Sequence, residues 1–104
     1  MEIRKTETFR KWLDGLKDIG GRGRILARLK RFEDGNPGDS KPLGDGLYEM
    51  RVTVGPGYRS YYFYRKQDLV ILLNGGDKKS QQRDIQKARS LMAEIIGEKD
   101  DKDK

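Results

Sequence analysis

The chain has 104 residues, enough for one domain with a single hydrophobic core but too few for two. It contains no cysteine and no histidine, which excludes disulfides and zinc–thiolate sites and removes the commonest acid or base near neutral pH. Its net charge of +6 favours a polyanionic partner.

The sequence also gives an expectation about the compartment. No apolar run reaches the roughly 18 to 20 residues that span a bilayer, and the N-terminus lacks the apolar region of a signal peptide. We therefore expect a cytoplasmic protein without membrane contact.

The N-terminal segment predicts a short strand followed by a helix. Residues 2–5 read as an edge strand, and Thr6 can cap a helix over residues 7–17, where apolar residues recur at helical spacing. These two elements begin the predicted domain.

A second amphipathic helix is expected after a break at Gly20 and Gly21, and Gly35 would close it. Three basic residues follow one another along its exposed face, either as a solvated surface or as a ridge that binds a polyanion backbone. These residues are Arg24, Arg28 and Arg31.

The middle of the chain predicts a loop and then a β-hairpin. Residues 35–46 are rich in turn formers, and the alternating runs 47–54 and 58–64 are joined by Gly-Pro-Gly. A three-residue loop would pair position 51 with 61 and position 53 with 59. One sheet face would then carry Arg51, Arg59 and Tyr61.

The C-terminal part predicts a central strand and a last helix. Residues 69–73 form a continuous apolar run that suits a strand covered on both sides. After a turn through residues 74–79, Ser80 can cap a helix that ends at Gly97. We expect one domain over residues 1–97 and a disordered charged tail over residues 98–104.

The predicted order is therefore βααβββα, an α+β fold with a small, mostly antiparallel sheet. All three helices would pack on one sheet face. The other face would be partly solvated, and the hairpin arginines are assigned to it.

This order resembles the RelE/ParE toxin superfamily, and most closely its phage-derived addiction-module killer branch, which is related to HigB. The resemblance is carried by LYEMRV at 47–52, GPGYRSYY at 55–62 and LNGGDKKSQ at 73–81. It implies the toxin of a toxin–antitoxin module, which cleaves mRNA, typically on the ribosome, and is held inactive by a cognate antitoxin. Antitoxins of this branch commonly carry a helix-turn-helix, so DNA contact would come through the partner.

The same resemblance implies roles for three cations. Arg59 matches the arginine that contacts the scissile phosphate, Arg51 a basic position on the preceding strand, and Lys78 a cation beside the last strand. Some relatives use a histidine or a C-terminal tyrosine near the cleavage site, but this chain has no histidine and no tyrosine after Tyr64. The general acid and base therefore stay open.

The chemistry of RNA self-cleavage suits these residue types and requires neither a metal nor a cofactor. When a 2′-hydroxyl attacks the adjacent phosphate, the enzyme must align the groups, move protons and stabilise negative charge. A planar guanidinium can meet two phosphate oxygens and stays charged, so Arg51 and Arg59 are the predicted catalytic cations. Neighbouring cations favour the uncharged form of a lysine, which makes Lys78 or Lys79 a candidate for proton transfer, although both also suit a solvated turn.

Aromatic side chains add a candidate surface for bases. Tyr58 and Tyr61 could stack on an exposed base, as aromatic residues do in RNA-binding sheets. Two other functions fit the same sequence: a ParE-like inhibitor that binds DNA gyrase, and a catalytically inert module that binds RNA or sequesters an antitoxin.

Overall fold

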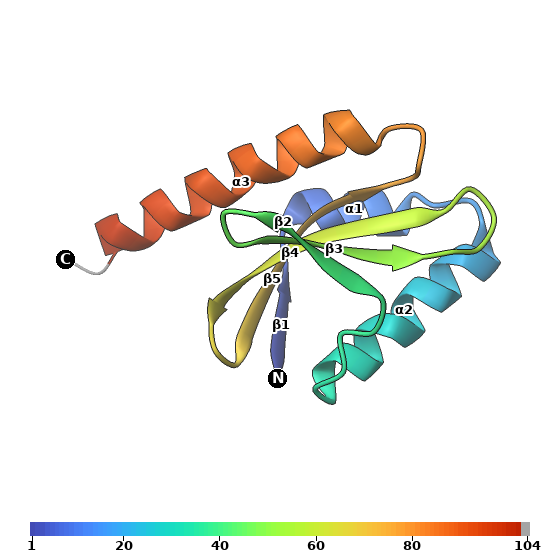
Figure 1. Cartoon of the computed structure of the whole chain (residues 1–104), viewed down its shortest axis with the longest axis horizontal. Helices are drawn as coiled ribbons and strands as arrows, with labels where there is room; N and C mark the ends of the chain where they lie inside the picture. Colours follow the sequence, from blue (N-terminus) through green and yellow to red (C-terminus); the bar gives the residue numbers. More distant parts are fainter. Residues whose placement is uncertain (103–104) are drawn as a thin grey trace.

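A five-stranded sheet forms the centre of the protein in the computed structural model, which describes residues 1–102 and the side chains of residues 1–98 (Figure 1). The strand order is β1-β5-β4-β3-β2, with β1 parallel to β5 and the other pairs antiparallel. The predicted α+β class is confirmed. The elements are β1 (Glu2–Lys5), α1 (Glu7–Asp14), α2 (Ile19–Glu33), β2 (Ser40–Gly44), β3 (Leu47–Val52), β4 (Tyr58–Lys66), β5 (Leu69–Gly76) and α3 (Gln81–Lys102).

Helices cover both faces of the sheet, so the prediction that all three pack on one face is wrong. In Figure 1, α3 lies above the sheet and α2 below it. The reason is β5, which is buried without interruption from Leu69 to Asn74. Its alternate side chains enter two cores: Val70 and Leu72 pack with α1 and α2, whereas Leu69, Ile71 and Leu73 pack with α3. Among the described residues, no helix is long and apolar enough to cross a membrane.

The segment predicted as a loop over residues 35–46 contains a strand, so the order is βααββββα. Strand β2 pairs antiparallel with β3 at the edge of the sheet. Its Pro42 has no N–H to donate, which is tolerated at an edge but conceals the strand from a reading of turn residues.

The hairpin of β3 and β4 has a different register from the predicted one. Arg51 lies opposite Arg59 and Val52 opposite Tyr58, because five residues, 53–57, connect the strands instead of three. The shift is by two residues, so it leaves every side chain on its predicted face. Arg51 and Arg59 therefore still share a face.

Three helix ends also differ from prediction. Helix α1 ends at Asp14, and α2 begins at Ile19 with Asp18 as its cap, so Gly20 and Gly21 lie inside α2. A Cβ atom at Gly21 would collide with the ring of Tyr58, which explains this glycine as close packing rather than as a helix break.

The last helix passes through Gly97, where we expected its end, and continues to Lys102. The described part of the predicted disordered tail, residues 98–102, is therefore helical. Residues 103 and 104 lie outside the described residues.

Candidate anion-binding site at the hairpin turn

A hollow of about 270 Å³ lies at the turn end of the β3–β4 hairpin. The loop between β5 and α3 closes one side of it, where the Lys78 amide donates to the carbonyl of Pro56 at 3.4 Å. Three of the four predicted catalytic residues meet here, and none of the lining side chains is acidic. The hollow is lined by Arg51, Val52, Thr53, Gly55, Pro56, Gly57, Tyr58, Arg59 and Lys78.

The two arginines project from directly opposite positions of the hairpin. The amide of Arg51 donates to the carbonyl of Asp39 at 2.9 Å, and its own carbonyl accepts from Arg28. Both backbone groups of Arg51 therefore point away from β4, which makes its pair with Arg59 a non-hydrogen-bonded one, where Cα atoms are only ~4.5 Å apart. Like charges placed this closely repel each other, so each guanidinium needs a counter-charge.

The counter-charge of Arg59 is a buried carboxylate that our sequence reasoning did not single out. Arg59 Nε lies 3.6 Å from Oε2 of Glu49, whose side chain is 0% exposed whereas that of Arg59 is 13% exposed. Gln81, at the start of α3, donates to the same oxygen at 2.8 Å. Arg59 Nη1 also donates to the carbonyl of Gly57 at 2.9 Å. The sequence signal was an acidic residue two positions before Arg51, and therefore on the same strand face.

Arg51 has a more exposed counter-charge. Its Nη2 lies 3.3 Å from Oδ1 of Asp39, and the two side chains are 36% and 47% exposed.

The two candidate lysines occupy different places. Both are exposed, but only Lys78 lines the hollow. Lys79 lines a separate depression together with Gln82 and Arg83. The structure thus distinguishes two lysines that sequence reasoning left equivalent.

The two candidate stacking tyrosines are buried. Tyr61 is 0% exposed and packs with α3, and burial together with the nearby charge of Glu49 raises the pKa of its hydroxyl. The expectation that Tyr61 lies on a solvated face is wrong, because α3 covers that face.

Tyr58 lies in the other core and is 6% exposed. Its hydroxyl donates to Oδ2 of Asp18 at 2.8 Å, and burial followed by this hydrogen bond raises the pKa of Tyr58. Tyr58 borders the hollow but does not present an open ring face to a base.

The arginine ridge expected on α2 is not continuous. Arg28 donates to the carbonyls of Arg51, Pro37 and Asp39 at 2.6, 3.2 and 3.3 Å, so its guanidinium fastens the segment before β2 and the end of β3 to α2. Arg24 and Arg31 are exposed on α2.

The glycine pair Gly75-Gly76 lies in β5 and not in the predicted turn. A Cβ atom at Gly75 would collide with the ring of Trp12, and one at Gly76 with the carboxylate of Asp84. Close packing from both sides of the sheet therefore explains these glycines, and they lie outside the lining of the hollow. In the part of the chain that the structure describes, no group of three or more acidic side chains could hold a metal ion.

Comparisons with known proteins place the chain among small proteins of similar size. A family model described as phage-derived protein Gp49-like (DUF891) matches residues 11–93, a range that contains the whole lining of the hollow. An uncharacterized protein from Haemophilus influenzae is 44% identical over 95 residues, which cover 91% of this chain and 96% of that protein.

Two solved structures are also similar. A chain in the crystal structure of the toxin–antitoxin complex RelBE2 from Mycobacterium tuberculosis has a TM-score of 0.50 and 25% identity, over 74% of this chain and 96% of that one. The solution structure of a conserved hypothetical protein, HP0894, from Helicobacter pylori has a TM-score of 0.51 and 20% identity, over 76% and 96%. The second likeness concerns the fold alone.

Proposed function

We propose that this chain, which belongs to the phage-derived protein Gp49-like family, is the toxin of a toxin–antitoxin module and an endoribonuclease that cleaves mRNA. The likeness to a chain of the RelBE2 toxin–antitoxin complex supports the toxin role. Its partners would be a cognate helix-turn-helix antitoxin and mRNA on the ribosome, with DNA contacted only through the antitoxin. Within the RelE/ParE toxin superfamily, we propose that the chain belongs to the HigB-related branch.

The observation that carries this proposal is the cationic lining of the hollow. Arg51, Arg59 and Lys78 meet around about 270 Å³ with no acidic side chain in the lining. Such a site suits a phosphodiester, because guanidinium groups bind phosphate oxygens through two N–H donors at once.

In the proposed reaction the 2′-oxygen of RNA bonds to the adjacent phosphorus as the bond to the 5′-oxygen breaks. Arg51 and Arg59 stabilise the negative charge that develops on the phosphoryl oxygens, a contribution that commonly amounts to about 10²- to 10³-fold in rate for one donor. The Lys78 ammonium donates a proton to the departing 5′-oxygen. Water accepts the proton of the 2′-hydroxyl, since no carboxylate or imidazole lines the hollow.

The test compares two neighbouring lysines. Purified wild-type protein, Lys78→Ala and Lys79→Ala are incubated with mRNA, with and without ribosomes, and the fragment ends are mapped by sequencing. We expect Lys78→Ala to lower the cleavage rate about 10²- to 10⁴-fold, whereas Lys79→Ala, which removes the same charge outside the hollow, retains the wild-type rate.

Expression in cells separates the proposal from its alternatives. Intact mRNA accompanied by DNA damage would favour gyrase inhibition, and RNA binding without fragments or growth arrest would favour an inert module. Either result would overturn the nuclease.

A further inference from the structure

We propose that Glu49 is a positioning residue, whose buried carboxylate fixes the guanidinium of Arg59 so that its free edge faces the hollow. The inference rests on the proposed function and adds a residue that does not itself line the hollow. Neither the composition of the hollow nor the comparisons with known proteins assign this role.

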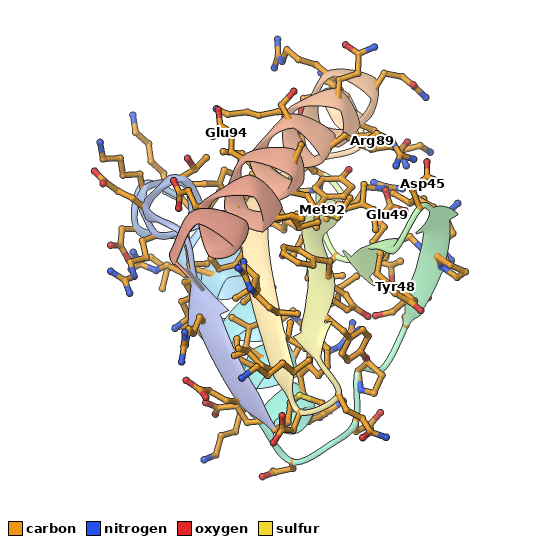
Figure 2. All side chains as sticks on the ribbon, turned by 90° about the vertical axis from the view of Figure 1, so that its left-hand side faces the viewer. Asp45, Tyr48, Glu49, Arg89, Met92 and Glu94 are labelled. Atoms are coloured by element: carbon orange, nitrogen blue, oxygen red, sulfur yellow. The ribbon has the colours of Figure 1, made fainter. Side chains whose placement is uncertain are left out.

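The register of the hairpin brings the two side chains together. Glu49 lies opposite Tyr61 and Arg51 opposite Arg59, so Glu49 and Arg59 are diagonal neighbours on one face, within reach of two long side chains. In Figure 2, Glu49 lies beneath α3, the helix that carries Met92 and Arg89. Gln81 at the start of α3 donates a hydrogen bond to Glu49 and so orients its carboxylate. The same carboxylate oxygen lies 3.6 Å from Nε of Arg59 and attracts the guanidinium.

Stability does not explain a carboxylate in this place. Glu49 is 0% exposed, and its Oε1 and the hydroxyl of Tyr61, the residue opposite it in the sheet, are both buried without a hydrogen-bond partner among the described residues. A buried carboxylate with an unsatisfied oxygen is unfavourable, and replacing a buried ion pair by apolar residues is often neutral or stabilising. We therefore attribute the buried carboxylate of Glu49 to the orientation of Arg59 and not to the stability of the fold.

The contacts of Arg59 show what is oriented. Its Nε faces Glu49 and its Nη1 donates to the carbonyl of Gly57. Arg59 Nε makes no hydrogen bond within the described residues, so its restraint is the 3.6 Å charge contact with Glu49, while the hydrogen bond at Nη1 restrains a second point of the planar guanidinium. Nη2 makes no hydrogen bond within the described part of the chain. A donor fixed in advance does not have to reorganise as charge develops on a phosphate, which is where electrostatic catalysis gains most.

The decisive variant is Glu49→Gln, which keeps the size of the side chain and an oxygen that can accept from Gln81 but removes the charge facing Arg59. We expect the single-turnover cleavage rate to fall about 10- to 100-fold, less than loss of the donor itself. Affinity for uncleavable RNA with 2′-O-methyl groups should stay within about twofold of wild type. Glu94→Gln, the same chemical change at an exposed position of α3 (Figure 2), should leave both quantities unchanged.

Two further measurements distinguish positioning from a general structural effect. In an Arg59→Ala background, Glu49→Gln should lower the cleavage rate no further, because the group that it positions is gone. NMR relaxation of Arg59 Nε–H should show an ordered side chain in the wild type and a mobile one in Glu49→Gln.

The outcomes separate the two proposals. A wild-type protein that cuts no RNA refutes the proposed function, and the NMR comparison still tests the positioning of Arg59. A Glu49→Gln variant with an equally ordered Arg59, or with an undiminished cleavage rate in an active enzyme, overturns the inference. Equal rate losses in both backgrounds overturn it as well.

Discussion

Arg59 and Arg51 lie opposite each other in one hairpin and line the same hollow, yet the protein surrounds them differently. Arg59 is 13% exposed and faces a carboxylate that is 0% exposed, whereas Arg51 is 36% exposed and its partner Asp39 is 47% exposed. An exposed ion pair contributes little to stability, and a buried pair becomes costly when one partner is removed. We call the buried Arg59–Glu49 pair the rear of the hollow and the exposed Arg51–Asp39 pair its front. We infer that the rear is rigid and that the front can adjust to a ligand.

The largest expected effect comes from Arg59→Ala, which breaks the rear. Cleavage should fall by at least about 10²- to 10³-fold through loss of a phosphate donor. The free energy of unfolding should also fall by about 3 kcal/mol, since Glu49 is left buried without its cation. Urea unfolding and a cleavage assay measure the two losses separately.

The double variant Arg59→Ala/Glu49→Gln is the matched control for that result. It should regain most of the unfolding free energy without regaining cleavage. If stability does not return, the Arg59–Glu49 contact is not what the single variant broke.

A smaller effect is expected at the front. Arg51→Ala should lower the cleavage rate about 10²-fold, the lower end of the range for one donor. The free energy of unfolding should change by less than about 1 kcal/mol, because the partly exposed pair with Asp39 contributes little. The same two assays apply. A loss of stability as large as that of Arg59→Ala would remove the distinction between front and rear.

The smallest effect concerns the hydrogen bond between Asp18 and Tyr58, a residue that borders the hollow. Asp18 caps α2 and accepts the hydroxyl of Tyr58, and the hydrogen bond from the Gly21 amide, followed by that from Tyr58, lowers the pKa of Asp18 below its ordinary value of 3.8. A lowered carboxyl pKa means that the stabilisation is complete above pH 3.8 and is lost as the pH falls through the lower, folded-state pKa. Acid unfolding followed by circular dichroism should therefore be shallower in Asp18→Asn, and an unchanged profile would contradict this assignment.

Some features could be predicted from the sequence because they depend only on how polar and apolar residues alternate within one strand or helix. Arg51 and Arg59 were placed on one face despite the wrong register, since an error of two residues preserves the alternation of a strand. The α+β class followed in the same way from the periodicity of the apolar runs.

Other features depend on contacts between distant segments and could not be read locally. Strand β2 exists because β3 offers it an edge, although its own residues read as a loop. Tyr61 and Glu49 are buried because α3 crosses their face. Arg28 donates hydrogen bonds to three backbone carbonyls of segments distant in the sequence, which could not be predicted from the residues of its own helix.

Strand β5 ends in two glycines, Gly75 and Gly76, which are in close contact with helices on both faces of the sheet and lie just before Lys78 of the hollow. Trp12 from α1 presses on Gly75, and Asp84 from α3 presses on Gly76, so neither position has room for even one methyl group. Lys78 follows two residues later in the same chain segment. A side chain at either glycine would force the strand, Trp12 or Asp84 to move. If the strand moves, Lys78 moves with it, so under the proposed function cleavage would be sensitive to two positions outside the lining of the hollow.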